Sequence, residues 1–425
     1  LHSIITLNSN VIKEARSRDK SRPKESKYTL YGLPILLKDN INTIGMPTTA
    51  GAFALKENSI TDDAFIVKKL KESGALILGK ANLSEWAYYF CDGCPLGYSA
   101  IGGQTLNPYG RKIFETGGSS SGSGVSVAAN YAVAAVGTET SGSILSPSSK
   151  NSVVGLKPTI GLLSRTGIVP ISSTLDTPGP MTKNVMDNAI FIAAMAGSDV
   201  EDASTLNVLS TVDYLKDLNT STMKGKRLGV MRDLLSDSIY KKNIELLQKA
   251  GAIIVEFEPI QLQLDGFLTL LNIDMKYDLP NYLSTYADKS LKIKSIEDVI
   301  QINIKDSLQR APYGQQLFNG ILKDATTLAE LEIVKNNLSS KGKQFFNEPM
   351  DSLNLEAILS INNYHAGFAA VAKYPCLTVP MGYEKSGEPI SLTFIAKPFQ
   401  EQKLLKLGYA FEQLSKVRKQ PKNFQ

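Results

Sequence analysis

The sequence predicts an α/β fold with a large, mixed, mostly parallel twisted sheet flanked by helices. Short apolar runs typical of buried strands alternate with segments whose apolar residues recur at helical spacing. The 425 residues are 43% hydrophobic and 20% charged, a composition that can bury a large core. No internal repeat and no clear linker divides the chain. We therefore expect one domain over residues 1–425.

The first half of the chain predicts alternating strands and helices. Strands are expected at residues 75–79, 132–138 and 153–159, and residues 31–40 predict a short apolar strand that ends in a polar loop. Helices are expected at residues 62–74, 83–90, 123–132 and 186–197. Ser84 would cap the second of these helices, and glycines follow the first and the last.

The pattern of predicted elements changes in the middle of the chain. Residues 225–233, 240–251 and 252–259 indicate a strand, a helix and a strand, which is a βαβ-like unit. Residues 265–345 are polar and predict helices. Strands return at 373–383 and 389–398, and an amphipathic helix is expected at 401–416.

The charge distribution disfavours nucleic acid as a partner. The net charge of +5 is spread over the whole chain, and the basic stretch 16–27 is typical of a solvated surface. No segment approaches the ~20 apolar residues of a membrane span. The chain begins at Leu1 rather than at methionine, so a processed start is expected. A cytoplasmic location is favoured, and export stays open.

Histidine and cysteine are scarce. Cys91 and Cys94 form a single C-x-x-C, and the only histidines are His2 and His365. One such pair cannot complete a tetrahedral zinc site, so no metal and no other cofactor is expected. Two separate loop cysteines and a local disulfide both remain open.

Two short motifs offer alternative functions. "GALILGKA" (74–81) has phosphate-loop spacing, but Ala81 stands where a Ser or Thr would hold magnesium. "GSSSG" (118–122) matches the nucleophile elbow of α/β-hydrolases, with Ser120 at its centre. That elbow needs a preceding strand, which residues 110–117 do not predict, and a downstream histidine, for which only His365 is available.

A hydrolase without a catalytic histidine can use a neutral lysine as its base. Lys38 follows an apolar run that would carry it inward at a strand end. Lowering its pKa from about 10.4 to near 7 costs roughly 4 kcal/mol, which burial without a carboxylate partner can impose. The alternative is a surface lysine paired with Asp39.

Serine and glycine gather in two segments, "GGSSSGS" (117–123) and "TETSGSI" (138–144). Attack on an amide carbonyl needs a nucleophile and backbone N–H groups aimed at the developing oxyanion. Small residues let a substrate approach the backbone closely. The alternative is a pair of flexible loops.

These segments resemble the amidase signature family. Residues 117–189 look like its serine- and glycine-rich hallmark region, and "GLPILLKDNINTIGMPTTAGA" (32–52) resembles its lysine segment. The resemblance implies a catalytic core region at 28–198, a variable and mostly helical region at 199–350, and C-terminal strands and a helix at 351–425 that complete the core.

The resemblance also implies a Ser–cis-Ser–Lys triad. Ser143 would be the nucleophile, Ser119 the bridging serine after a cis peptide bond, and Lys38 the base. Ser120 would lie next to these residues and help to hold them in position. The backbone cradle for the oxyanion and substrate would comprise Thr140, Ser141, Gly142 and Ser143.

The implied activity is amide hydrolysis through an acyl-enzyme. Within the family the resemblance is nearest to bacterial peptide amidases, so a peptide C-terminal amide or another carboxamide is expected as substrate, with the protein a monomer or homodimer. The alternatives are the glutaminase subunit of a tRNA-dependent amidotransferase and a catalytically silent scaffold. Two departures stand out: Ser141 replaces a common glycine, and Leu145 replaces a common arginine.

Overall fold

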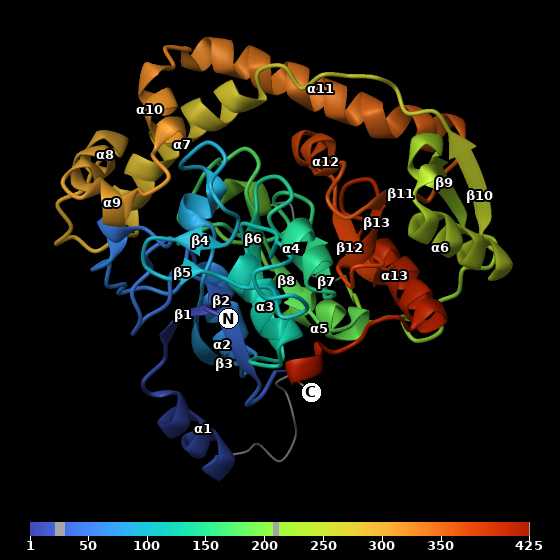
Figure 1. Cartoon of the computed structure of the whole chain (residues 1–425), viewed down its shortest axis with the longest axis horizontal. Coiled ribbons are helices and arrows are strands. Elements are labelled where there is room, and N and C mark those ends of the chain that lie inside the picture. Colours follow the sequence, from blue (N-terminus) through green and yellow to red (C-terminus); the bar gives the residue numbers. More distant parts are fainter. Residues whose placement is uncertain (22–29, 207–211, 425) are drawn as a thin grey trace.

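A computed structural model describes residues 1–21, 30–206 and 212–424 of the chain. In these residues eleven strands form one sheet, and a separate two-stranded hairpin lies beside it (Figure 1). The strands of the large sheet are β1 (Ile4–Leu7), β2 (Pro34–Lys38), β3 (Leu76–Ala81), β6 (Ala134–Glu139), β7 (Val154–Lys157), β8 (Thr177–Thr182), β9 (Arg227–Met231), β10 (Ile253–Phe257), β11 (Ala357–Ile361), β12 (Cys376–Tyr383) and β13 (Pro389–Ile395). The hairpin comprises β4 (Tyr98–Ser99) and β5 (Gly103–Gln104).

The sheet is mixed, as expected, but the prediction that it is mostly parallel is wrong. Its strand order is β1-β3-β2-β6-β8-β7-β12-β13-β11-β9-β10. Parallel pairing is confined to β3–β2–β6 and β11–β9–β10, and the remaining neighbours are antiparallel. Alternating strands and helices favour parallel crossovers, but β12 and β13 follow each other as an antiparallel pair.

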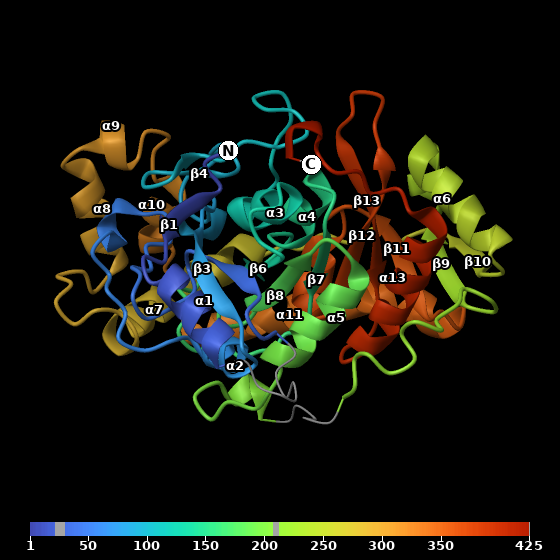
Figure 2. The same ribbon diagram turned by 90° about the horizontal axis from the view of Figure 1, so that it is seen from below.

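Helices surround this sheet on both faces. They are α1 (Val11–Lys20), α2 (Phe65–Glu72), α3 (Ser121–Ala128), α4 (Leu145–Lys150), α5 (Val185–Met195), α6 (Ser238–Lys249), α7 (Phe267–Thr285), α8 (Ile296–Ile304), α9 (Ser307–Arg310), α10 (Gln316–Lys323), α11 (Leu328–Ser352), α12 (Ala366–Ala372) and α13 (Glu401–Ser415). Viewed after a quarter turn, α5 and α13 lie along one side of the strands (Figure 2). None of the described helices is long and apolar enough to cross a membrane.

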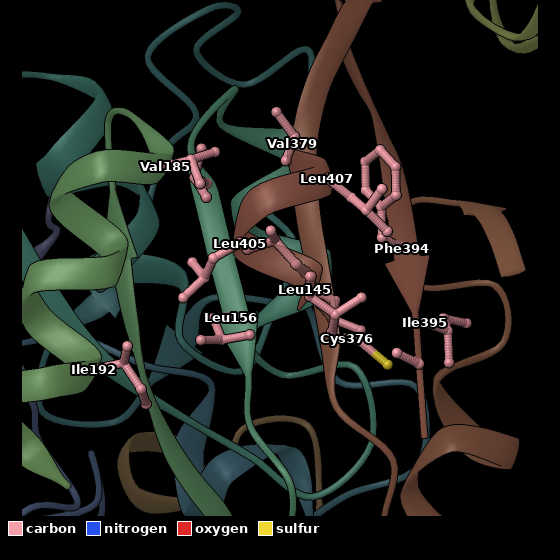
Figure 3. Close-up of a cluster of buried hydrophobic side chains, with 14 of the residues drawn as sticks. Leu145, Leu156, Val185, Ile192, Cys376, Val379, Phe394, Ile395, Leu405 and Leu407 are labelled. Carbon is pink, nitrogen blue, oxygen red and sulfur yellow. The ribbon is translucent and has the colours of Figure 1, made fainter. Parts of the chain in front are cut away.

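The core follows from the alternation of side chains along the strands. On β2, Ile35 and Leu37 belong to the large cluster packed by α2, α5 and α13, whereas Leu36 joins a smaller cluster with Val127 and Ala128 of α3. Figure 3 shows part of the large cluster, in which side chains of β7, β12 and β13 meet those of α5 and α13. Both faces of the sheet are therefore buried.

The middle of the chain forms a helical region whose longest helix, α11, packs on α12 and β11. The predicted helices at 265–345 are confirmed as α7 to α11, and the long α11 begins at a capping box between Thr327 and Glu330. The predicted βαβ unit is also confirmed, because β9 and β10 pair in parallel.

The helix expected at 83–90 is wrong in detail. Residues Glu85–Tyr88 form a 3-10 turn in which Trp86 and Ala87 have left-handed backbone angles. The hydroxyl of Ser84 does not cap this turn but accepts a hydrogen bond from the N–H of Gly97 at 2.8 Å. The surface expected at 16–27 lies partly outside the described residues.

Candidate active site

The deepest polar group of the site is Lys38, the last residue of β2. Its side chain is fully buried, and its Nζ lies 2.7 Å from Ser119 Oγ. The same nitrogen lies 2.8 Å from Thr138 Oγ1 and 3.1 Å from the carbonyl oxygen of Thr138 on the neighbouring strand β6. The structure therefore brings the predicted base and the predicted bridging serine into hydrogen-bonding contact.

Burial lowers the pKa of Lys38 to about 7, although Asp176 and Glu139 raise it through their charge. The alternative in which Lys38 pairs with Asp39 at the surface is wrong. Asp39 is fully buried, and its carboxylate lies 3.3 Å from Nζ of Lys80. Because Asp39 is engaged elsewhere, Lys38 keeps only neutral groups as hydrogen-bond partners among the described residues.

Ser119 lies in a tight turn that leads into α3. The Gly118–Ser119 peptide bond is cis, and the carbonyl oxygen of Ser119 accepts a hydrogen bond from the N–H of Ser84 at 3.0 Å. A Cβ atom on Gly118 would lie 2.6 Å from Ser84 Oγ and 2.6 Å from Leu96 Cδ2. A larger residue at this position would therefore require the side chains of Ser84 and Leu96 to move.

Ser120 connects the two serine segments, and its supporting role in catalysis stays a prediction. Its N–H donates to the carbonyl oxygen of Ser143 at 3.1 Å. Its hydroxyl donates to the carbonyl oxygen of Thr138 at 3.0 Å and accepts from the N–H of the same residue at 3.2 Å. These bonds fix the position of Ser143 relative to Ser119, and they leave Ser120 no part in a nucleophile elbow.

The turn that carries Ser143 is held by the carboxylate of Glu139, a residue that sequence reasoning missed. The N–H groups of Gly142 and Ile144 each donate to it at 2.7 Å, and that of Leu145 donates at 2.9 Å. Gly142 has a φ of +86°, which favours glycine. Its N–H is occupied by Glu139 and is therefore not available to an oxyanion in this arrangement.

Of Lys38, Ser119 and Ser143, only Ser143 reaches solvent. It retains 8% exposure, whereas Lys38 and Ser119 retain none. In the described residues its hydroxyl makes no hydrogen bond, so the structure does not join it to Ser119 directly. The backbone N–H groups of Ser141 and Ser143 likewise have no acceptor within the described residues, which leaves them available to a ligand.

Thr140 connects this turn to the neighbouring cavities. Its hydroxyl donates to Asp176 at 2.5 Å, and burial raises the pKa of that carboxyl. A cavity of about 10 Å³ lies against Thr138, Thr140 and Asp176. A larger one of about 160 Å³ shares Asp176 and adds the acidic residues Glu201, Asp202 and Asp278.

Lys80 and His365, which the alternative motifs required, do not form part of this site. Lys80 of the phosphate-loop-like motif is buried on β3 and pairs with Asp39, so it is not free to hold a phosphate. Nδ1 of His365 lies 2.6 Å from Ser360 Oγ, and its ring stacks on Phe345.

Cys91 and Cys94, for which two alternatives were open, form a disulfide with their Cα atoms 5.6 Å apart. The bonded pair lies in the loop after the left-handed turn at Trp86 and Ala87. The N–H of Leu317 at α10 donates to the carbonyl oxygen of Phe90 in the same loop. The disulfide therefore supports a loop that docks on the helical region.

Leu145 and Ser141, the two residues that differ from the common family pattern, lie in different surroundings. Leu145 is 1% exposed and belongs to the large apolar cluster, where Figure 3 shows it near Cys376. It therefore places no charge beside Ser143. Ser141 is partly exposed, and its Oγ lies 4.0 Å from where a Cβ on Gly367 would stand.

The fold and the buried lysine–serine contact are those of an amide hydrolase. The family model of the amidases matches residues 1–405, and the chain belongs to that family. A Ser–Ser–Lys triad is typical of that family.

Relatives with known structures or descriptions agree with this assignment. A probable amidase of Arabidopsis thaliana is 36% identical over 438 residues, which cover 99% of this chain and 85% of the relative. The peptide amidase of Stenotrophomonas maltophilia superimposes with a TM-score of 0.93 at 38% identity, covering 99% and 90% of the two chains. The A subunit of glutamyl-tRNA(Gln) amidotransferase from Thermotoga maritima gives a TM-score of 0.69 at 26% identity, covering 98% and 92%.

Proposed function

We propose that this amidase releases ammonia or an amine from a peptide C-terminal amide or another carboxamide, with Ser143 as nucleophile, Ser119 as proton bridge and Lys38 as base. One observation carries the proposal. Lys38 Nζ lies 2.7 Å from Ser119 Oγ in a fully buried setting that lowers its pKa to about 7. About half of the lysine is then neutral at pH 7, against roughly one part in 10³ for an unperturbed lysine.

Acylation begins when neutral Lys38 accepts the proton of Ser119, which in turn accepts the proton of Ser143. The Ser143 oxygen forms a bond to the carbonyl carbon of the amide, and the carbonyl oxygen becomes an oxyanion. The unoccupied N–H groups of Ser141 and Ser143 are the donors in place to receive that charge. The proton returns through Ser119 to the amide nitrogen as the C–N bond breaks.

Deacylation repeats the same proton path with water in place of Ser143. Lys38 accepts a proton through Ser119 while the water oxygen bonds to the acyl carbon. The Ser143 oxygen leaves and takes the proton back. The hydrogen bonds that the turn donates to Glu139 hold the oxyanion donors in one orientation through both steps, which lowers the reorganisation that each step requires.

The substrate class follows from similarity and from Leu145. Greater identity and better superposition make the peptide amidase of S. maltophilia a better guide than the amidotransferase relative. Buried Leu145 removes the cation that other family members place next to the nucleophile. We therefore expect neutral amides to be preferred to substrates bearing a carboxylate, and glutamine to be a poor substrate.

The test combines active-site labelling with product analysis. A fluorophosphonate probe followed by peptide mass spectrometry should label Ser143 in the wild type and leave Ser143→Ala unlabelled. Ser146→Ala on α4 is the matched control, because this serine is 9% exposed and lies only three residues away. Ammonia release should be measured from a panel of peptide amides, acyl amides and glutamine.

Each outcome has a separate meaning. Ammonia from peptide amides, lost in Ser143→Ala and retained in Ser146→Ala, supports the proposal. Ammonia from glutamine alone, and only when the partner proteins of an amidotransferase are added, supports the glutaminase alternative instead. Labelling of another serine, or undiminished turnover by Ser143→Ala, contradicts the assignment of the nucleophile.

A further inference from the structure

The hydroxyl of Thr138 lies within hydrogen-bonding distance of two side-chain nitrogen atoms. Lys38 Nζ lies 2.8 Å from Thr138 Oγ1, and the Nδ2 group of Asn40 lies 3.0 Å from the same oxygen. Asn40 is 2% exposed, and Nδ2 also faces the carbonyl oxygen of Val169 at 3.4 Å, which sets the orientation of the amide. Asn40 is therefore a donor to Thr138.

The direction of the lone pair of neutral Lys38 depends on whether the Thr138 hydroxyl accepts from Lys38 or donates to it. A neutral amine has two N–H groups and one lone pair, and Lys38 has three polar neighbours: Thr138 O, Thr138 Oγ1 and Ser119 Oγ. If both oxygens of Thr138 accept N–H bonds, the lone pair faces Ser119, as a base requires. If the Thr138 hydroxyl donated to Lys38 instead, the lone pair would be occupied and an N–H would face Ser119.

We propose that Asn40 is a positioning residue that keeps the Thr138 hydroxyl an acceptor toward Lys38, so that the lone pair of Lys38 is directed at Ser119. The inference rests on the proposed function of Lys38 as base. The amide donor occupies one lone pair of Thr138 Oγ1, the N–H of Lys38 occupies the other, and the hydroxyl hydrogen turns away from Lys38 toward the cavity of about 10 Å³ that both Asn40 and Thr138 line.

The free-energy cost of burying the Asn40 side chain suggests that this residue is present for function rather than for stability. Its Oδ1 atom is buried and has no hydrogen-bond partner among the described residues. An unsatisfied buried carbonyl destabilises a fold, so the Oδ1 side of the amide contributes nothing to stability. The donation from Nδ2 to Thr138 is what Asn40 provides to the site.

The carboxylates around Lys38 do not set the orientation of its amine, which depends on the hydrogen bonds to Thr138 and Ser119. Asp176 and Glu139 act on Lys38 through their charge, and Asp39 is paired with Lys80. None of the three carboxylates contacts Lys38 Nζ within hydrogen-bonding distance in the described residues. Removing Asn40 changes none of these charges, so the pH midpoint of activity should stay near that of the wild type.

The test is a double-mutant cycle between Asn40 and Thr138. Asn40→Leu should lower kcat roughly 10- to 100-fold, a part of what a positioned general base contributes, with KM changed less than about twofold. In a Thr138→Val background the hydroxyl is gone, so Asn40→Leu should lower kcat by no more than about twofold further. Asn40→Ala repeats the measurement with a smaller side chain in case Asn40→Leu does not fold.

Asn42→Leu is the matched control. Asn42 lies in the same loop and is 1% exposed, but its amide bonds Tyr282 of α7 and the backbone of Tyr286, which follows α7, rather than Thr138. Asn42→Leu should lower thermal stability. Any loss of kcat that it causes should be the same with Thr138 present and in the Thr138→Val background.

The outcomes separate the two proposals. A wild type that turns over no amide contradicts the proposed function itself. A wild type that turns over, with Asn40→Leu and Asn40→Ala retaining its kcat, contradicts the role of Asn40 alone. An equal loss of kcat from Asn40→Leu with Thr138 present and in the Thr138→Val background would also overturn it, because the effect would not pass through the hydroxyl.

Discussion

Two neighbouring strand ends, those of β2 and β3, each bury a lysine, and the two lysines have different partners. Leu37 pairs with Lys80 across the strands, so Lys38 and Lys80 lie within one residue of each other in register. Both side chains are 0% exposed. Lys80 meets the carboxylate of Asp39, whereas Lys38 meets a serine, a threonine hydroxyl and a carbonyl.

The comparison shows that the partner, more than burial, separates a structural lysine from a base. Desolvation lowers the pKa of both amines, but the Asp39 carboxylate favours the charged form of Lys80. Asp39 follows Lys38 directly in the chain and still does not pair with it. Successive side chains at a strand point in opposite directions, so Asp39 is directed toward Lys80.

The largest effect should come from removing the amine of Lys38. Lys38→Met fills the same space without a base, and we expect kcat to fall at least about 10³-fold. Wild-type kcat/KM should rise with pH through about 7, as Lys38 loses its proton, and then level off. Steady-state assays from about pH 5.5 to about pH 9 measure both quantities. Activity near that of the wild type in Lys38→Met at pH 7 would contradict its role.

The next effect should come from the other lysine, in stability. Lys80→Met leaves Asp39 buried without its cation, and breaking a buried pair on one side costs about 3–5 kcal/mol. Urea unfolding at pH 7 measures this loss. Lys80→Met combined with Asp39→Asn removes the unpaired charge and should recover most of it. If Lys80→Met unfolds at the wild-type urea concentration, the ion pair contributes no stability.

Family motifs pointed to the residues of the proposed triad, but the sequence could not predict that Lys38 and Lys80 have different partners. Lys38, Ser119 and Ser143 come from three distant segments, and only the sheet order β2–β6 shows that Thr138 lies next to Lys38. Glu139, which holds the nucleophile turn, has no local signal beyond its place before a glycine-containing loop.

The sequence predicted the elements that local patterns determine. It missed the elements whose conformation is determined by tertiary contacts. β8 reads Thr-Pro-Gly-Pro-Met-Thr, and two prolines argue against a central strand, yet it lies between β6 and β7. Its neighbours impose the extended form. The left-handed turn at Trp86 and Ala87 was likewise missed, because non-glycine residues rarely adopt that conformation in succession.

The smallest predicted effect tests the protonation of Lys38 without any substrate. Lysine in the unfolded chain has a pKa near 10.5, and burial lowers it to about 7 in the folded protein. Between these values the unfolded state binds more protons, so the free energy of unfolding rises with pH; below pH 7 both states are protonated and the penalty is at its largest. The wild type should therefore gain about 2 kcal/mol from pH 7 to pH 9 relative to Lys38→Met.

Comparing the two proteins at each pH removes the contribution of every other titrating group. Urea unfolding at pH 7, 8 and 9 gives the difference, and Lys38→Met should be the more stable protein at pH 7. A difference that stays constant over this range would mean that Lys38 keeps its proton in the folded state. Lys38 would then resemble Lys80, and the contrast between a base and a structural lysine would be lost.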